Sequence, residues 1–455
     1  MTFETTICAI STASGMGAVG IVRISGRDSF SVVENLVVRR DAFRSVEPRK
    51  MLYTSICDER GVQLDEVMVA KFVAPSSFTG EDMVEIYCHG SEYIEQQIVA
   101  TLVHFGAVLA RPGEFTQRAF LNGKMDLSQS EAVADLISSS TAESHRVALS
   151  QLKGKVSSKI AEMRARMLEL TALLELELDF SEEDVEFADR TKLVNLIDDI
   201  CTETDVLISS FKYGNAVKSG VPVAIVGEPN AGKSTLLNAL LHEDRAIVSS
   251  EAGTTRDTVE EEFVLDGIKF RFIDTAGIRE AGSEVEELGI RRTYERLKSA
   301  RIVLLVLDTS APKGHNDSIV GSIRNEIDAE TKLFLVFNKS DLIDVESIID
   351  NADSVCISAL NGTNVDSLCS MLVQYVKSLK PEISDVIITN LRHVSSLETT
   401  RSLLVSAKKS ICDGIPSDFI AQDLREANYH LGEITGAIST DEVLGNIFSK
   451  FCIGK

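Results

Sequence analysis

Residues 227–235 read Gly-Glu-Pro-Asn-Ala-Gly-Lys-Ser-Thr and match G-x-x-x-x-G-K-[ST], the pattern of a phosphate-binding loop. Its two glycines let backbone amides turn toward a polyphosphate, and the helix that follows adds the positive end of its dipole. Lys233 would bridge the outer phosphates, and the Ser234 hydroxyl would bind Mg²⁺. An apolar run at 221–226 precedes the loop and a helical pattern at 234–241 follows it, as the motif requires. The alternative is a glycine-rich turn with an incidental lysine.

Two further motifs would complete the phosphate and magnesium chemistry. Residues 274–277, Asp-Thr-Ala-Gly, end a predicted strand. Asp274 would hold the Mg²⁺ shell through water, and the Gly277 amide would contact the γ-phosphate and release it on hydrolysis. Thr255, in the run Gly-Thr-Thr-Arg-Asp of residues 253–257, fits the first switch segment and would be the second Mg²⁺ ligand.

The run Asn-Lys-Ser-Asp at 338–341 ends another predicted strand and would read the base. Asp341 can accept two hydrogen bonds from guanine, whereas adenine lacks the amino donor and would leave a buried carboxylate unpaired. Asn338 and Lys339 would brace the loop and cover the base, and a backbone amide of 358–360 would meet the guanine O6. The motifs predict GTP binding by Asn230, Ala231, Gly232, Lys233, Ser234, Thr235, Ser249, Ser250, Glu251, Ala252, Gly253, Thr254, Thr255, Asp274, Thr275, Ala276, Gly277, Asn338, Lys339, Asp341, Ser358, Ala359 and Leu360.

The position after Asp-Thr-Ala-Gly decides how water would be activated. It holds Ile278, so the glutamine that orients the attacking water in Ras-type GTPases is missing from this position. Asn230 in the phosphate loop could help to hold a monovalent cation, which would replace an arginine finger electrostatically. Glu286 could reach the site from the second switch; the alternative is an exposed charge on a surface helix.

Composition bounds the possible partners. The net charge of −23 argues against a generic nucleic-acid binder, so any contact with RNA would need a local basic patch. The 455 residues allow two to four domains, and 44% hydrophobic with 25% charged residues is typical of a globular chain. The eight cysteines form no C-x-x-C pair, which fits a reducing compartment. With no apolar run of membrane-spanning length and no signal-peptide pattern at the N-terminus, we expect a cytoplasmic protein.

Short strand and helix patterns mix in residues 1–118. Strands are predicted at 6–10, 20–24 and 67–73, and the glycine-rich segment 14–20 is expected to be a loop.

Three carboxylates and a histidine gather in residues 77–90, which read as a turn followed by an alternating strand. Glu81, Asp82 and Glu85 are expected to sit close to His89. The alternative is a set of solvated turn charges beside a histidine with its own partner.

Helical patterns dominate from Ala142. Apolar residues from Leu149 to Leu174 recur at steps of three and four, which predicts one stripe on one long helix. A second helix is predicted at 193–211 and a linker at 212–220. Strand and helix patterns then alternate from 222 to 379, which predicts a parallel sheet with helices on both faces. Helical patterns return at 391–409, 417–438 and 440–451.

Together these patterns predict a multidomain chain with α/β and all-α parts. A P-loop domain of residues 216–380 would be inserted in a helical domain formed by 119–215 and 381–455. An α+β domain of residues 1–118 would precede both.

The form G-x-P-N-x-G-K-S-T, Ile278 and the run Phe-Cys-Ile-Gly-Lys at 451–455 resemble the MnmE (TrmE) family of tRNA modification GTPases. The resemblance covers the whole chain. It is specific because other small GTPases share the nucleotide motifs but not the additional runs, at 17–26, 78–81, 111–116 and 118–124.

For the N-terminal domain, the resemblance implies similarity to tetrahydrofolate-binding domains and a role in forming a homodimer. It implies that Arg23, Glu85, Lys124 and Lys455 bind a 5-formyltetrahydrofolate-type one-carbon donor. For Lys455 to reach that site, the helical domain would have to fold back or cross the dimer. Cys452, the only cysteine inside a family motif, is a candidate catalytic thiol.

For the nucleotide domain, the resemblance implies GTP hydrolysis with a bound potassium ion. Asn230, Ser249, Glu251 and Thr254 would be its ligands, Glu286 would be the catalytic residue that orients water, and two such domains would pair. With an FAD-containing partner, MnmG, in a complex of two copies of each protein, the family adds an aminomethyl or carboxymethylaminomethyl group to C5 of the wobble uridine (U34) of certain tRNAs.

Two other functions share the nucleotide motifs. A ribosome-assembly GTPase would act as a switch that binds RNA without modifying it, but such proteins usually add a basic RNA-binding domain. An ATPase motor is disfavoured by Asp341.

Overall fold

The computed structural model describes residues 5–179, 190–241, 247–248, 261–273, 297–312, 314–342, 353–381, 385–439, 441–449 and 451–454. The chain divides into two compact units. The first consists of Met1–Ile137, Gln151–Asp189 and Ser406–Lys455, and the second of Ser138–Ser150 and Arg190–Val405. The domain boundaries expected from the sequence stay a prediction. None of the helices in the described ranges has the length and apolar composition that crossing a membrane requires.

A six-stranded sheet forms the N-terminal part of the first unit. Its strand order is β3-β4-β5-β2-β1-β6, and neighbours are antiparallel except β1 and β6. Helices α1 and α3 pack their apolar residues into the core of this sheet. The elements are β1 (Ile7–Ile10), β2 (Gly17–Ser25), α1 (Ser29–Leu36), α2 (Arg40–Ser45), β3 (Met51–Cys57), β4 (Gln63–Phe72), β5 (Met83–Gly90), α3 (Glu92–His104), β6 (Val108–Leu109) and α4 (Glu114–Leu121).

The segment expected to be a glycine-rich loop is partly strand, so that prediction was wrong for residues 17–19, whereas Gly20 lies in a strand as predicted. Residues from Gly17 onward belong to β2, with a register shift between Gly17 and Gly20. A side chain on Gly90, the partner of Gly17 in β5, would place its Cβ 2.5 Å from the Gly17 carbonyl oxygen. The glycines here allow two strands to approach closely rather than forming a turn.

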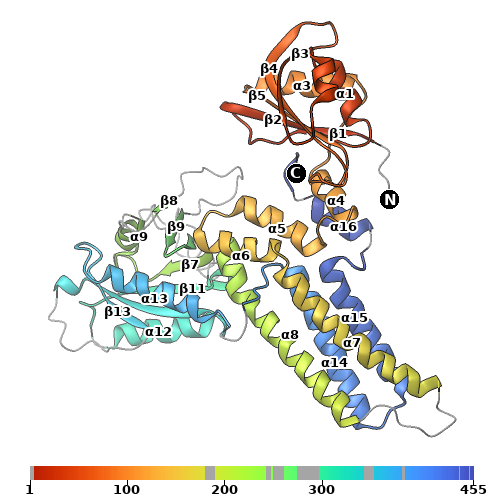
Figure 1. Cartoon of the computed structure of the whole chain (residues 1–455). Helices are drawn as coiled ribbons and strands as arrows, with labels where there is room; N and C mark the ends of the chain where they lie inside the picture. The colour runs from red at the N-terminus through yellow and green to blue at the C-terminus, as the bar shows by residue number, and fades with distance from the viewer. Residues whose placement is uncertain are drawn as a thin grey trace. The chain divides into compact units, whose positions relative to one another are not determined.

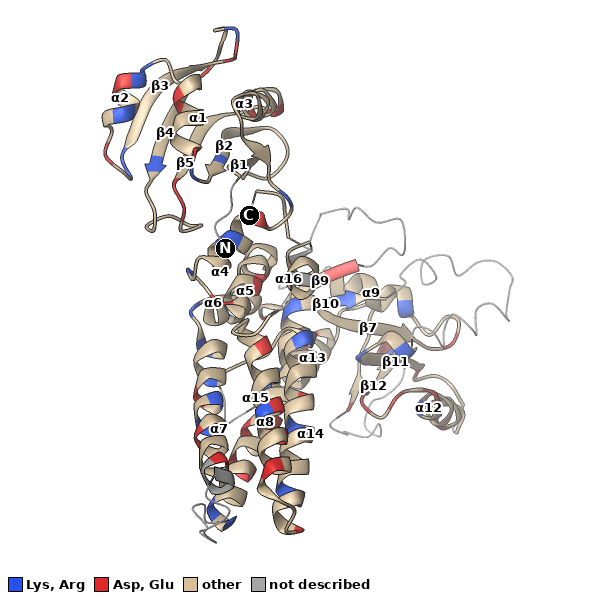
Figure 2. Cartoon of the chain, turned by 90° about the vertical axis from the view of Figure 1, so that its right-hand side faces the viewer, with Lys and Arg blue, Asp and Glu red and all other residues tan. Residues whose placement is uncertain are grey.

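The helices of the first unit are α5 (Leu127–Ser138), α7 (Lys155–Asp179), α15 (Ser417–Thr435) and α16 (Asp441–Phe448). Helices α7 and α15 lie side by side (Figure 1). The apolar stripe predicted for α7 is buried at Val156, Ile160, Met163, Met167, Leu170 and Leu174. Lys, Arg, Asp and Glu are interspersed along its remaining surface (Figure 2).

One long helix was predicted from Ala142 onward, but the structure has two. Helix α6 (Ala142–Leu152) ends before Gly154, and α7 begins at Lys155. Gly154 has a φ of 83°, in the left-handed region that ends helices. The Gln129 side chain donates to the Leu152 carbonyl at 2.9 Å and satisfies one of the carbonyls at this helix end.

A seven-stranded sheet lies at the centre of the second unit, in the order β13-β12-β11-β7-β10-β9-β8. Helices α9 and α13 pack on one face and α12 on the other. The elements are α8 (Arg190–Ser219), β7 (Val221–Val226), α9 (Lys233–Leu241), β8 (Ile247–Val248), β9 (Glu261–Leu265), β10 (Ile268–Phe272), β11 (Ile302–Asp308), α12 (His315–Glu326), β12 (Lys332–Asn338), the 3₁₀ turn η2 (Ser340–Leu342), β13 (Ser354–Cys356), α13 (Val365–Ser378) and most of α14 (Leu391–Cys412).

The prediction of a parallel sheet holds for five of these strands, from β13 to β10. It was wrong for β9 and β8, which are antiparallel to their neighbours. Asp266 and Gly267 have φ values of 48° and 78°, which suit a two-residue hairpin turn between β9 and β10. So short a connection can join only antiparallel strands.

The predicted linker 212–220 is instead the last part of α8, which continues to Ser219. Tyr213, Ala216 and Val217 are buried there, so packing holds the helix together. Gly214 lies within this helix and lets the backbone at Ile388 approach closely. A Cβ at position 214 would lie 2.0 Å from the Ile388 carbonyl oxygen.

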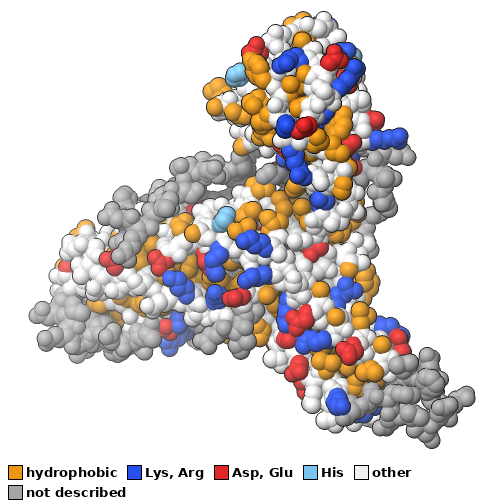
Figure 3. All heavy atoms as spheres, viewed as in Figure 1, with side chains coloured by type: hydrophobic (Ala, Val, Ile, Leu, Met, Phe, Trp, Pro, Cys, Tyr) orange, Lys and Arg blue, Asp and Glu red, His pale blue; other side chains and the backbone are white. Residues whose placement is uncertain are grey.

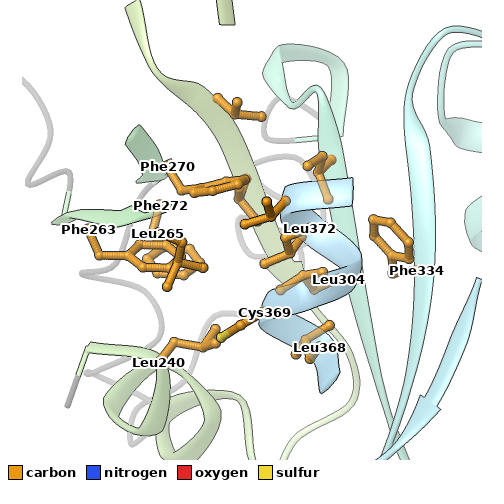
Figure 4. Packing of buried hydrophobic residues seen from close by; sticks show 14 of the residues in the cluster. Leu240, Phe263, Leu265, Phe270, Phe272, Leu304, Phe334, Leu368, Cys369 and Leu372 are labelled. Carbon is orange, nitrogen blue, oxygen red and sulfur yellow. The ribbon is translucent and has the colours of Figure 1, made fainter. Parts of the chain in front are cut away.

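Three phenylalanines anchor the core beneath the antiparallel edge (Figure 4). The rings of Phe263 and Phe272 stack with centroids 4.9 Å apart, and those of Phe263 and Phe270 are 5.3 Å apart. All three side chains are fully buried beside Leu240 and Cys369.

Removing the central ring should therefore destabilise the second unit. We expect Phe263→Ala to lower its free energy of unfolding by about 3–5 kcal/mol, because the change combines lost burial with a cavity. Urea denaturation followed by circular dichroism measures this. The matched control is Phe419→Ala, at a side chain that is 58% exposed, which should change stability by less than about 1 kcal/mol. Equal losses in both variants would contradict the assignment of this core.

Candidate functional site

The phosphate loop lies between β7 and α9, as the motif predicted. Gly227 has a φ of 150°, and a Cβ there would lie 2.3 Å from the backbone oxygen of Val306 in the neighbouring strand β11. Gly232 has a φ of 96°, and a Cβ there would lie 2.1 Å from Nδ2 of Asn338. Both glycines are thus required by close packing as well as by backbone conformation.

The side chain of Asn338 joins two of the predicted nucleotide loops. Its Nδ2 donates to the Ala231 carbonyl at 2.8 Å, and its Oδ1 accepts from the Ala359 amide at 3.0 Å. Asn338 is 3% exposed, and Ser358 and Ala359 are also buried. The structure therefore brings the phosphate loop and the 358–360 loop together around one amide.

Lys233 begins α9, and its ammonium lies over the phosphate loop. It donates to the carbonyls of Gly227 at 2.9 Å and Glu228 at 2.8 Å. Ser234 and Thr235 are exposed in the first turn of the helix. A cation and the positive end of a helix dipole thus converge where the sequence predicted phosphate binding.

The base-recognition loop follows β12. Ser358 Oγ donates to Asp341 Oδ1 at 2.6 Å, which links the two segments predicted to read the base. Asp341 is exposed in the 3₁₀ turn η2. Leu360 is 79% exposed.

Several predicted residues lie outside the described ranges. They are Ser249, Ser250, Glu251, Ala252, Gly253, Thr254, Thr255, Asp274, Thr275, Ala276, Gly277, Glu286 and Lys455. Among the predicted potassium ligands, Asn230 is described; it is exposed in the phosphate loop with a φ of 65°.

Arg23 and Glu85 form a second candidate site in the N-terminal sheet, where they face each other across β2 and β5. Arg23 Nη2 is 2.8 Å from Glu85 Oε1, and the Tyr87 hydroxyl donates to Glu85 Oε2 at 2.6 Å. Burial, this hydrogen bond and the charge of Glu85 raise the pKa of Tyr87 to about 12. The Arg23 guanidinium also lies over the rings of Phe78 and Phe115.

Lys124 joins this region through the turn at 75–81. Its ammonium is exposed and donates to the Pro75 carbonyl at 2.9 Å, while Asn122 Nδ2 donates to the Thr79 carbonyl at 2.8 Å. Since Phe78 of the same turn contacts Arg23, two of the predicted folate-binding residues contact one turn, and the third, Glu85, pairs with Arg23.

The segment 451–454 packs against the N-terminal domain of the same chain. Ser11 Oγ donates to the Gly454 carbonyl at 3.1 Å, and the Gly113 amide donates to the Cys452 carbonyl at 3.3 Å. The chain thus folds back far enough for Cys452 and Gly454 to contact its own N-terminal residues. The thiol-bearing residue Cys452 is exposed.

The expected cluster around His89 is split. His89 Nδ1 contacts Asp65 Oδ1 at 2.7 Å, whereas Glu81 binds Arg118. For His89 the structure therefore shows the alternative of a histidine with its own partner, and Glu81 lies in the turn before β5 while His89 lies near the far end of that strand.

A buried ionic network beneath the second site was missed from the sequence. Arg118 is fully buried; it contacts Glu81 Oε2 at 3.1 Å and Glu114 Oε1 at 3.0 Å, and it donates to the Thr5 carbonyl. Burial acts to raise the pKa of Glu114, but hydrogen bonds from the Arg111 amide and Arg118, with the charges of both arginines, outweigh it and lower the pKa overall. The i, i+4 spacing of Glu114 and Arg118 on a helix was the available signal.

Two family models match this chain: the GTP-binding protein TrmE N-terminus over residues 6–124, and the MnmE helical domain over residues 127–452. A tRNA modification GTPase MnmE from Parabacteroides distasonis is 46% identical across 99% of this chain and the full length of that protein. The chain belongs to the MnmE family. A relative of the same name from Flavobacterium johnsoniae is 45% identical across 99% of both chains.

Among solved structures, the G domain of the T. maritima FeoB iron transporter is 26% identical over 34% of this MnmE-family chain and 98% of its own length. The TM-score is 0.25, which is too low to carry an argument about fold.

The two hydrogen bonds of the Asn338 side chain, to the Ala231 carbonyl and the Ala359 amide, are called the Asn338 clamp below. They should be disrupted when Gly232 gains a side chain. In this MnmE-family chain we expect Gly232→Ala to weaken GDP binding more than about tenfold, because its Cβ displaces the Asn338 amide from the Ala231 carbonyl. Fluorescence titration with a labelled GDP measures this.

The control for Gly232→Ala is Gly314→Ala. Gly314 has a similar left-handed φ of 86°, but open space surrounds the position of a Cβ. If Gly314→Ala also weakened GDP binding tenfold, backbone strain rather than loss of the Asn338 hydrogen bonds would explain the effect.

The Glu114 network predicts a pH-dependent difference in stability. A carboxyl whose pKa is lowered by folding adds stability above its ordinary pKa near 4.5, and this stability is lost as the pH falls through the folded-state value. The melting temperature of the MnmE-family chain should therefore exceed that of Glu114→Gln at pH 7, and the gap should shrink below about pH 4.5.

Glu92→Gln, at an exposed glutamate that begins α3, is the control and should show a small, constant offset. If the difference in melting temperature between the parent protein and Glu114→Gln stays unchanged down to about pH 3, the Glu114 network does not cause the pH-dependent stability.

Proposed function

We propose that this chain is a GTP hydrolase that acts in tRNA modification. The observation that carries the proposal is the Asn338 clamp, which joins the phosphate loop and the 358–360 loop of the proposed guanosine-nucleotide site. This site lies within a chain of the MnmE family. The name of the relatives, tRNA modification GTPase, supplies the process.

The chain's own residues have defined tasks in GTP binding. Lys233 neutralises the outer phosphates, and the amides of the phosphate loop with the N-terminus of α9 bind their oxygens. Asp341 accepts hydrogen bonds from the guanine edge, and a backbone amide of the 358–360 loop meets the guanine O6. Ser234 and Thr255 are proposed as Mg²⁺ ligands; the ion, when bound, screens the charge that develops on the phosphates.

The finer steps of hydrolysis are proposed from the family resemblance. A potassium ion is held by Asn230, Ser249, Glu251 and Thr254, and Glu286 orients the attacking water. Asn230 supports this proposal because its exposed side chain lies in the phosphate loop. Pairing of two nucleotide domains would complete the site.

The N-terminal site is proposed to bind a 5-formyltetrahydrofolate-type donor. Arg23 and Lys124 contact one turn and Glu85 pairs with Arg23, and the segment before Lys455 contacts the same unit. Cationic groups suit the carboxylates of a folate, and the paired Glu85 suits a ring that donates hydrogen bonds. Cys452 is exposed, as a reacting thiol would have to be.

The proposed assembly is a homodimer that joins MnmG, which carries FAD, in a complex of two copies of each. Together they would add an aminomethyl or carboxymethylaminomethyl group at C5 of U34. The chain is acidic overall, but Figure 3 shows Lys and Arg side chains gathered on the visible face of the second unit, in the region of α6, which is compatible with a local contact to tRNA phosphates.

The deciding experiment compares tRNA nucleosides from cells with and without this chain. Loss of the modified wobble uridines, restored by the intact gene but not by Lys233→Ala, is the expected result. Nucleoside profiles that do not differ between the two strains would favour the ribosome-assembly alternative.

Hydrolysis should also depend on the monovalent cation. We expect GTP turnover to be at least about tenfold faster in potassium than in sodium at equal ionic strength, because a fitted cation stabilises transition-state charge by more than about 1.4 kcal/mol. Phosphate release measures this. Asn230→Ala should abolish the difference, and equal rates of the parent protein in both salts would exclude the cation role.

A further inference from the structure

Asp308, the last residue of β11, and the two residues that follow it lie beside the base-recognition loop. Strands β11 and β12 pair in parallel with Asp308 opposite Asn338, so the two strands end side by side at the same edge of the sheet. The next residues, Thr309 and Ser310, therefore run alongside Lys339. None of the three belongs to the motifs that predicted GTP binding.

Thr309 binds the backbone of this loop at three points. Its amide donates to the Asn338 carbonyl at 3.1 Å, and its hydroxyl lies 2.9 Å from the carbonyl oxygens of both Asn338 and Lys339. Lys339 has a φ of 68°, which a residue with a side chain rarely adopts. Such a conformation persists only where the surroundings hold it, and Thr309 supplies those contacts.

Asp308 holds the Lys339 side chain. Asp308 Oδ2 is 2.5 Å from the Lys339 ammonium, and Oδ1 accepts from the amide and hydroxyl of Ser310 at 2.8 and 2.6 Å. Partial burial acts to raise the pKa of Asp308, but the hydrogen bonds from Lys339 and Ser310 and the Lys339 charge lower it overall. The carboxylate is thus ionised at neutral pH. Asn316 of α12 ties its backbone down by donating to the Asp308 carbonyl at 3.0 Å.

We propose that Asp308 and Thr309 are positioning residues for guanine recognition. Asp341 follows Lys339 by two residues, so the left-handed turn at Lys339 sets where the Asp341 carboxylate points. Thr309 fixes that turn, and Asp308 holds the lysine stem that covers the base. The inference rests on the proposed binding of guanosine nucleotides and names residues that determine the base specificity of that site.

The test compares GDP with IDP, which lacks the 2-amino group that Asp341 reads. Thr309→Val keeps the side-chain shape and removes the hydroxyl. It should weaken GDP binding about fivefold, the effect of one lost hydrogen bond, and IDP binding less, so the preference for GDP falls. Asp308→Asn should act in the same direction, raising KM for GTP while kcat at saturation stays within about twofold. Asp341→Asn provides the reference for a lost preference.

Thr331→Val is the matched control. The Thr331 hydroxyl also donates to a backbone carbonyl, that of Ala300 at 3.2 Å, but next to the opposite end of β12. This variant should keep the parent preference for GDP whatever it does to the melting temperature. Thr309→Ser, which retains the hydroxyl, should keep the preference too.

Two outcomes would overturn the inference: a parental GDP preference in both Thr309→Val and Asp308→Asn, or an equal loss in Thr309→Ser and Thr309→Val. A parent protein that does not prefer GDP to IDP would instead contradict the proposed function. The two failures are therefore distinguishable.

Discussion

The hydrogen bonds of the Asn338 amide are the constraint around which the second unit is arranged. One buried side chain holds the phosphate loop on one side and the 358–360 loop on the other. It can do so only because Gly232 has no side chain, since a Cβ there would take the position of its nitrogen. Two loops that are more than a hundred residues apart thereby become one surface. A polar group buried this deeply is costly unless both its ends are satisfied, and here both are.

Strand register builds both candidate sites. In the N-terminal sheet, antiparallel pairing sets Arg23 opposite Glu85, and in the second sheet, parallel pairing sets Asp308 opposite Asn338. Each pair makes further hydrogen bonds. The Tyr87 hydroxyl donates to Glu85 in the first pair, and Thr309 and Ser310 donate to Asn338 and Asp308 in the second. Such support limits how far the side chains can move before anything binds.

The sequence predicted what depends on motifs and periodicity: the P-loop between strand and helix, the buried stripe of α7, and helices on both faces of a largely parallel sheet. It failed where tertiary packing decided. Gly214 suggested a linker but lets a helix approach the Ile388 carbonyl, and Gly17 suggested a loop but lies in a strand. The Glu81–Arg118 pair was missed because its partners are far apart in sequence and meet only through the fold. Asp308 and Thr309 were not predicted, because strand register brings them to the base-recognition loop and no sequence motif encodes that register.

The hydrogen bond between Ser11 and the Gly454 carbonyl joins residues separated by 443 positions. During translation, Ser11 leaves the ribosome long before its partner has been synthesised. The N-terminal sheet, whose strands are close in sequence, can form early, yet the surface that receives the tail stays uncovered until the second unit and the late helices have emerged. The contact of Ser11 with Gly454 therefore forms only after the chain has been synthesised as far as Gly454, and a product that ends earlier would keep the sheet but lack this contact.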